Sequence, residues 1–181
     1  MTQPKSRDKS KKRAAILDGA VDVFISMGYE LASMDKIAET AGVSKRTVYN
    51  HFGSKEGLFQ AVVSDFLEQR QTLKKIAYDP ASPLEGQLLA FAQAEIFLID
   101  SPRRIGLSRV LTKVFLQDVN YAMATVAKYP PLYDMFLLWL QGAMRDRKIR
   151  TDDPVMSARV FYALVQGAIT YPAMFSNGAN L

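Results

Sequence analysis

The sequence contains no cysteine and only one histidine, His51, among its 181 residues. The absence of cysteine excludes disulfides, thiol nucleophiles and cysteine-ligated metal sites. A metal or catalytic site built on His51 would need a second histidine or a cysteine as its partner, so we expect no metal, no cofactor and no enzymatic activity. A chain without disulfides also suits a reducing cytoplasm, where we expect the protein to reside.

The chain also lacks the sequence signals of several common protein classes. It has no phosphate-cradling glycine loop, no G-x-S-x-G elbow and no H-E-x-x-H zinc motif. No secretion signal is visible, because the basic start leads into an amphipathic stretch. The longest apolar stretch, residues 160–175, is too short to span a bilayer and contains Gln166 and Pro172. We therefore expect no membrane partner.

Positive charge is concentrated at the start of the chain, and the net charge is +5. A basic arm ahead of a folded domain favours binding to a polyanion, although a solubilising tail has the same composition. Asp8 is the only acidic residue within this segment. Its cations are Lys5, Arg7, Lys9, Lys11, Lys12 and Arg13.

Hydrophobic periodicity predicts helices throughout and no sheet. Apolar residues recur at helical spacing up to Met27, where Gly28 is expected to end the helix in a left-handed conformation. A long helix is expected from Lys55 to about Tyr78, and prolines divide the remainder into further helices. The predicted fold is all-α, and it divides into a basic arm (1–13), a three-helix unit (14–54) and a larger helical unit (55–181).

Residues 33–52 have the pattern of a helix-turn-helix, in which the second helix enters the major groove of DNA. Ser33 and Ser44 are expected N-caps of two short helices, joined by a tight turn at Gly42. Small residues at positions 38 and 41 allow close helix approach. The expected inward-facing residues are Ile37, Ala38, Ala41, Val43, Val48 and Phe52.

The outward-facing residues of the second helix are rich in hydrogen-bond donors. Lys45 and Arg46 suit guanine edges or phosphates, and Asn50 suits adenine. Hydroxyl groups can donate to phosphate oxygens, and the start of the next helix can meet another phosphate. The alternative is a solvated charged face on a structural helix. The predicted DNA-binding residues are Ser33, Ser44, Lys45, Arg46, Thr47, Tyr49, Asn50, His51 and Lys55.

The stretch from Ile16 to Phe59 resembles the N-terminal domain of the tetracycline-repressor (TetR) family. The resemblance implies that residues 14–54 form a DNA-binding domain and residues 55–181 a ligand-binding and dimerisation domain. It also implies a homodimer that binds an inverted-repeat operator and represses transcription until a small molecule enters the C-terminal domain. Family members often have a small residue where Arg46 stands, so altered contacts are expected there. The resemblance is carried by residues 16–20, Phe24, 27–29, Ser33-Met34, Ile37-Ala38, 41–44, 47–49, His51-Phe52 and 54–59. The rest resembles, more loosely, a C-terminal domain of one branch, through Arg103-Arg104, Tyr129-Pro130, 152–154, and Phe161 to Pro172.

A ligand pocket is the second predicted site. Glu95 falls near the centre of an apolar helical stripe, so its carboxylate is expected either to pair with Arg103, Arg104 or Arg109 or to face a polar cavity. Binding pockets are largely aromatic and apolar, as ordinary cores also are. The predicted pocket residues are Glu95, Phe91, Phe115, Tyr121, Met123, Trp139 and Tyr162, and small residues suited to close packing, within a subunit or across a two-fold axis, are Ala143, Ala163, Gly167 and Ala168.

Three functional classes remain open at this point. The first is a repressor that binds double-stranded DNA as a homodimer and responds to a small-molecule effector of unknown identity. The second is a DNA-binding regulator with a filled core and no effector. The third is an enzyme or carrier with an incidental helix-turn-helix head.

Overall fold

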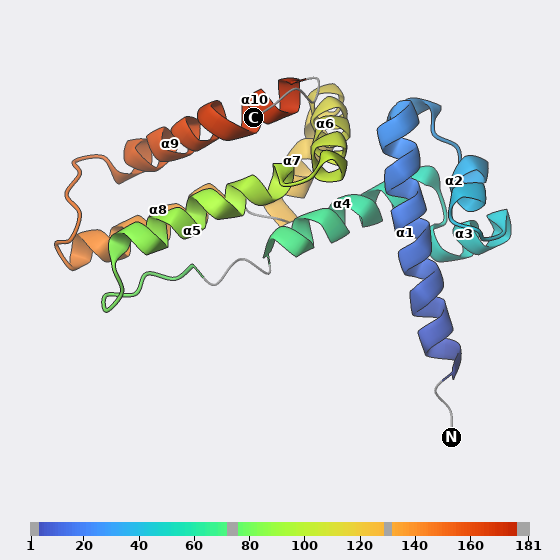
Figure 1. Cartoon of the computed structure of the whole chain (residues 1–181), viewed down its shortest axis with the longest axis horizontal. Coiled ribbons are helices and arrows are strands. Elements are labelled where there is room, and N and C mark those ends of the chain that lie inside the picture. Colours follow the sequence, from blue (N-terminus) through green and yellow to red (C-terminus); the bar gives the residue numbers. More distant parts are fainter. Residues whose placement is uncertain (1–3, 72–75, 129–131, 177–181) are drawn as a thin grey trace. The chain divides into compact units, whose positions relative to one another are not determined.

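A computed structural model describes residues 4–71, 76–128 and 132–176 (Figure 1). Within these ranges the ordered elements are all helical, which confirms the predicted all-α class. The chain forms two compact units. The first comprises residues up to Leu67 together with Val110–Val114, and the second comprises Glu68–Arg109 and the residues from Phe115 onward.

The first unit begins with a helix longer than expected. α1 runs from Pro4 to Leu31, so the basic segment that was expected to be an arm is helical from Pro4 onward. Gly28 has a left-handed φ of 77°, as predicted, although one further turn follows it. α2 (Met34–Thr40), α3 (Lys45–Phe52) and the start of α4 (Lys55–Gln71) complete the unit.

The core of the first unit is apolar and fully buried. Its central residues are Ile16 and Phe24 from α1, Ile37 from α2, Val48 from α3 and Leu58 from α4. Fully burying side chains of this size stabilises a fold by about 1.5–3 kcal/mol each. This shared core therefore fixes α3 against its three neighbours.

Close approach of α1 and α2 depends on a small residue at each side of their contact. A Cβ atom added to Gly19 would lie 3.1 Å from the Cβ atom of Ala41. Sequence reasoning expected the small residue at position 41 to allow close approach of the second short helix, whereas the structure places Ala41 against Gly19 of α1.

The end of α4 differs from the prediction. The helix was expected to reach Tyr78, but it ends at Gln71, and residues 76–79 are not helical. Tyr78 packs instead on α8 (Leu132–Arg145), with its ring edge-on to Trp139 at 6.1 Å and its hydroxyl donating to Asp146 at 2.9 Å. These contacts explain why a residue with helical periodicity leaves the helix.

The remaining helices belong to the second unit, except for Val110–Val114 of α6, which belong to the first. α5 spans Leu84–Ile96 and continues as a short 3-10 turn, η1 (Phe97–Ile99). α6 (Pro102–Gln117) and α7 (Val119–Lys128) follow, and α8 packs against α9 (Pro154–Val165). A π-helical turn, η2 (Gln166–Thr170), joins α9 to α10 (Tyr171–Phe175).

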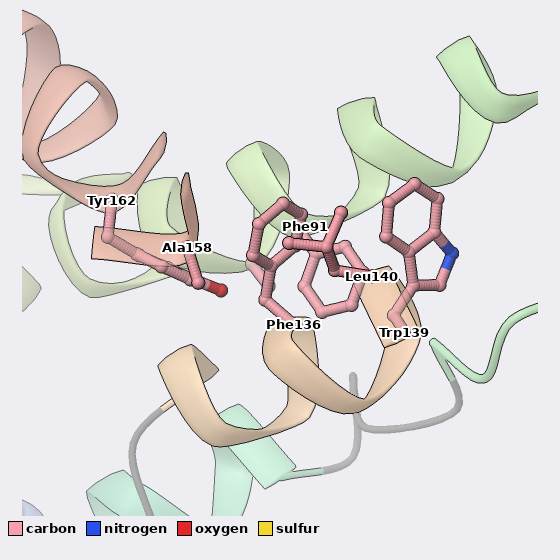
Figure 2. Close-up of a cluster of buried hydrophobic side chains, with 7 residues drawn as sticks. Phe91, Phe136, Trp139, Leu140, Ala158 and Tyr162 are labelled. Atoms are coloured by element: carbon pink, nitrogen blue, oxygen red, sulfur yellow. The ribbon is translucent and has the colours of Figure 1, made fainter. Parts of the chain in front are cut away.

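Aromatic rings fill the centre of the second unit. Figure 2 shows them between α5, α8 and α9. Phe136 stacks on Phe161 at 4.3 Å and meets Phe91 edge-on at 5.1 Å. Such aromatic pairs are worth about 0.5–1.5 kcal/mol each beyond their area burial. The buried cluster comprises Phe91, Ala94, Phe136, Trp139, Leu140, Ala158 and Tyr162.

Candidate DNA-binding surface

The two short helices of the first unit begin with side-chain caps. The Ser33 hydroxyl accepts a hydrogen bond from the Lys36 amide at 3.2 Å, and the Ser44 hydroxyl accepts one from the Thr47 amide at 3.2 Å. The intervening turn uses Gly42 at a φ of 64°, a conformation that favours glycine. The predicted caps and turn are confirmed, and they set the start of α3.

The inner face of this helix pair is buried as predicted. Ile37, Ala38 and Val48 are at most 4% exposed. Val43 and Phe52 are half-buried at the margin of the same core. Because its inner face is locked, α3 presents its opposite face in one fixed orientation.

The outer face of α3 gathers the side chains that the sequence assigned to DNA. Lys45, Arg46, Tyr49 and Asn50 are exposed, and Thr47 is half-buried beside the Ser44 cap. The hydroxyls of Thr47 and Ser44 lie 2.8 Å apart. This eight-residue helix therefore offers cationic, amide and hydroxyl donors together on one solvent-facing side, which is the chemistry that base edges and phosphates require.

An acidic residue that sequence reasoning missed lies beside these donors. Asp35, in the first turn of α2, forms an ion pair with Lys45, whose Nζ atom is 2.9 Å from its carboxylate. The hydrogen bond to Asp35, and then its charge, raise the pKa of Lys45 above its ordinary value. The sequence gives no sign of this pair, because a contact between residues ten positions apart leaves no periodic signal. Lys45 therefore has an acidic partner within the first unit, and its predicted contact with DNA stays a prediction.

Lys55 has contacts that the sequence did not predict. Its ammonium donates to the carbonyls of Tyr29 and Glu30, at 3.0 and 3.1 Å, and lies 4.6 Å from the Tyr29 ring centroid. Carbonyls at a helix C-terminus attract cations. Lys55 thus ties the start of α4 to the end of α1, and its contact with a phosphate stays a prediction.

The junction between α3 and α4 is tightly packed. The Ser54 hydroxyl accepts a hydrogen bond from the Gly57 amide at 3.1 Å. A Cβ atom added to Gly57 would overlap the carbonyl oxygen of Phe52, the last residue of α3. Glycine at position 57 therefore allows α4 to start directly against the end of α3.

His51 lies on the last turn of α3 and is half-buried. Its ring centroid is 5.9 Å from that of Phe52. In the described part of the chain, no cluster of three potential metal ligands occurs around it or elsewhere. Its predicted DNA contact stays a prediction.

The predicted pocket residues of the second unit fall into separate groups. Phe91, Trp139 and Tyr162 belong to the buried aromatic cluster. The rings of Phe115 and Tyr121 pair with each other at 5.8 Å. The remaining two residues differ in exposure, because Met123 is 67% exposed and Glu95 is only 4% exposed.

Two of the arginines considered as partners of Glu95 have other contacts. Arg104 pairs with Asp100, and its guanidinium carbon lies 3.7 Å from the Phe97 ring centroid. Arg109 donates to the backbone carbonyls of Ala173, Met174 and Ser176 at the end of α10. These contacts do not decide which group pairs with Glu95, and its predicted salt bridge to one of the three arginines stays a prediction.

Two of the pockets of the second unit are lined by described residues, and none of the predicted pocket residues lines either of them. One pocket, of about 340 Å³, is lined by residues between Ile76 and Ala90, including Gln87. The other, of about 570 Å³, follows α9 and includes Met156, Val160 and Leu164. No helix in the described ranges is long and apolar enough to cross a membrane.

Comparisons with known proteins cover both units. Residues 16–62 match the family described as bacterial regulatory proteins of the tetR family, and residues 86–181 match the C-terminal domain of AefR-like transcriptional repressors. The HTH-type transcriptional regulator SrpR of Pseudomonas putida is 26% identical over 174 residues, covering 93% of this chain and 78% of SrpR.

Solved structures are similar over nearly the whole chain. A TetR family transcriptional regulator from Pseudomonas syringae pv. tomato has a TM-score of 0.74 and 30% identity, covering 94% of this chain and 86% of its own. NalD of Pseudomonas aeruginosa, described as the secondary repressor of a multidrug efflux pump, has the same fold, with a TM-score of 0.68, 22% identity and coverage of 96% and 89%. The capped α2–α3 pair, the donor-rich face of α3 and the two family matches together place this chain in the TetR family of DNA-binding transcription regulators, a family of regulators and not of enzymes.

Proposed function

We propose that this regulator is a repressor that binds an inverted-repeat operator as a homodimer and is released by a small-molecule effector. The observation that carries the DNA half is the exposed set Lys45, Arg46, Tyr49 and Asn50 on a helix whose opposite face is locked in a core. The match to a C-terminal domain of transcriptional repressors supports repression over activation.

The DNA half of the proposal is tested by selecting bound sequences from a random duplex pool. We expect recovery of an inverted repeat with half-sites about one helical turn, or 34–36 Å, apart, or a multiple of that spacing. Tyr49→Ala and Asn50→Ala should weaken binding to the recovered sequence, whereas Gln141→Ala, an exposed substitution in the second unit, should not. Recovery of no preferred sequence would refute the DNA half.

The homodimer is supported by an apolar stripe on α9. Met156, Val160 and Leu164 repeat at four-residue spacing, so they share one side of the helix, and each is at least 49% exposed. The small residues Ala163, Gly167 and Ala168 are also exposed nearby, whereas Ala143 on α8 is fully buried within the subunit. Contiguous exposed apolar surface of this kind is typical of protein interfaces.

The dimer is tested by the mass of the protein in solution. Leu164→Asp, placed at the stripe, should convert a dimer into a monomer in light scattering or sedimentation experiments. Leu89→Asp is the matched control, because Leu89 is 55% exposed on α5 and lies outside the stripe. A monomeric wild-type protein, or dissociation by both substitutions alike, would contradict the proposal.

The effector half rests on buried polar groups in the second unit. Glu95 is 4% exposed on α5, which packs against the π-helical turn η2. On that turn the buried Thr170 hydroxyl has no hydrogen-bond partner in the described part of the chain. Buried polar groups normally find partners, and π-helical turns are frequent at functional sites. An apolar effector with an amine or hydroxyl group would match this chemistry.

Release would operate through a conformational equilibrium. An effector that prefers a body conformation with an altered spacing of the two DNA-binding heads lowers operator affinity without touching DNA. The test is operator affinity against a panel of apolar amines and alcohols, with Glu95→Gln expected to weaken the response and to leave effector-free binding intact. If no compound of the panel changes the affinity, the effector half fails.

A regulator without an effector is the second candidate, and one observation favours it. The aromatic cluster is packed ring to ring, with centroid separations of 4.3 Å for Phe136–Phe161 and 5.1 Å for Phe91–Phe136. A core filled in this way has room for a ligand only if it rearranges. Binding of any apolar amine or alcohol, detected through the fluorescence of Trp139, the only tryptophan, would separate the two candidates.

A further inference from the structure

The apolar stripe of α1 becomes cationic toward its N-terminus. Ile16 and Ala20 face the core of the first unit and are fully buried. At about 100° per residue, Lys9 and Arg13 lie on the same side of α1, one to two turns before that core begins. Both side chains are exposed, and neither has an acidic partner among the described residues. Beyond the core, the side of α1 that faces inward farther along the helix therefore carries two exposed positive charges.

Arg13 connects this cationic stripe to the recognition helix. Its guanidinium lies 5.8 Å from the ring centroid of Phe52, the last residue of α3. Figure 1 shows the N-terminal half of α1, in dark blue, running on past α2 and α3. Lys9 is one turn farther along, roughly 6 Å beyond Arg13. The two cations thus continue the line of the DNA-binding surface past the C-terminal end of α3.

We propose that Lys9 and Arg13 form a second phosphate-binding surface, which contacts the DNA backbone beside the groove that α3 enters. The proposal rests on the proposed DNA-binding function and adds a partner for the basic segment of α1. A recognition helix contacts bases mainly through its N-terminal part, so the chain at its other end lies near the flanking backbone. Lys12 is excluded from the surface, because it pairs with Asp8 at 2.8 Å.

The same helix provides a matched control for this proposal. Lys11 lies roughly 180° around α1 from the midpoint between Lys9 and Arg13, and its side chain is also exposed. Lys9→Gln, Arg13→Gln and Lys11→Gln each remove one positive charge from the same short stretch of helix. Only the first two remove it from the proposed surface. Lys9→Gln matters in addition because it removes charge without disturbing the Arg13 contact with Phe52.

The experiment measures affinity between about 50 and 200 mM salt, by fluorescence anisotropy, for the full-length chain. The probes are the duplex recovered from the random pool, with its flanks, and a mixed-sequence duplex of the same length. Removing one phosphate contact should reduce the slope of log affinity against log salt by about 0.9, so the Lys9/Arg13 double variant should show a reduction of about 1.8. Lys11→Gln should leave the slope unchanged. Both duplexes should weaken to the same degree, because phosphate contacts carry no sequence information.

The outcomes separate this proposal from the one on which it rests. Slopes that do not change for Lys9→Gln and the double variant, or that change equally for Lys11→Gln, overturn the second surface while DNA binding stands. A wild-type protein that recovers no preferred duplex overturns the DNA-binding proposal itself. Helical content from circular dichroism is compared across the variants, and all three positions are exposed, so normal folding is expected.

Discussion

Gly57 offers a sharp test of how the DNA-binding unit is assembled. It is the third residue of α4, and a Cβ atom there would overlap the backbone carbonyl of Phe52. The Phe52 carbonyl oxygen can move away only if the end of α3 moves with it. Gly57→Ala should therefore overpack this junction and destabilise the fold by about 1–3 kcal/mol. Removing a glycine from a helix contributes roughly 0.5–1 kcal/mol in the opposite direction, so the net destabilisation is somewhat smaller.

Gly86→Ala is the matched control for this substitution. Gly86 is likewise the third residue of its helix, α5, and no atom lies within 4 Å of an added Cβ. It should therefore show only the favourable helix contribution of about 0.5–1 kcal/mol. Urea unfolding followed by circular dichroism gives both values, and a melting-temperature change of about 2–4 °C per kcal/mol is expected.

The DNA-binding assay completes the test. Displacement of the end of α3 by Gly57→Ala should also weaken binding to the selected duplex, whereas Gly86→Ala should not change it. If the two alanine variants have equal stability and equal affinity, the packing argument for the α3–α4 junction is refuted.

Three further predictions concern single polar contacts. Asp35→Asn should free Lys45 and remove a negative charge, so the salt dependence of DNA binding should steepen by about one unit, with tighter binding to unrelated duplexes. An unchanged slope would show that Lys45 gains no phosphate contact when Asp35 is neutralised, and would refute this prediction. Ser44→Ala removes the cap of α3 and should cost about 1 kcal/mol in urea unfolding, together with a decrease in DNA affinity; Ser82→Ala, which caps no helix, is its control. Gln87→Ala removes the oxygen that accepts a hydrogen bond from the buried Trp139 indole at 2.8 Å. The substitution should destabilise the fold by about 1–3 kcal/mol. Tryptophan emission should also shift to longer wavelength, because water enters beside the indole.

The helix-turn-helix was predictable because its signals are local. Ser44 and Gly42 each determine the backbone within a few residues of themselves, and both do so in the structure as expected. The inward-facing residues Ile37 and Val48 follow from helical periodicity alone. The fold class and the exposed face of α3 could therefore be predicted, because both depend on interactions between residues close together in the sequence.

The errors and omissions of the sequence analysis involve contacts between distant residues. α4 ends before Tyr78 because that residue's ring and hydroxyl bind α8, more than fifty positions away. Asp35 was overlooked because its ion pair with Lys45 crosses a turn. The pocket residues were not resolved from the core, because rings that pack together and rings that enclose a ligand have the same composition.

The contact of Arg109 with the end of α10 has a consequence for how this region tolerates substitution. The guanidinium binds the main-chain oxygens of residues 173, 174 and 176, and these oxygens are present whatever side chains stand there. Among the side chains of this contact, only that of Arg109 on α6 is therefore required. Residues at the receiving end are free to vary as far as packing allows, while replacement of Arg109, even by lysine with its single ammonium, removes the planar group that spans several carbonyls at once.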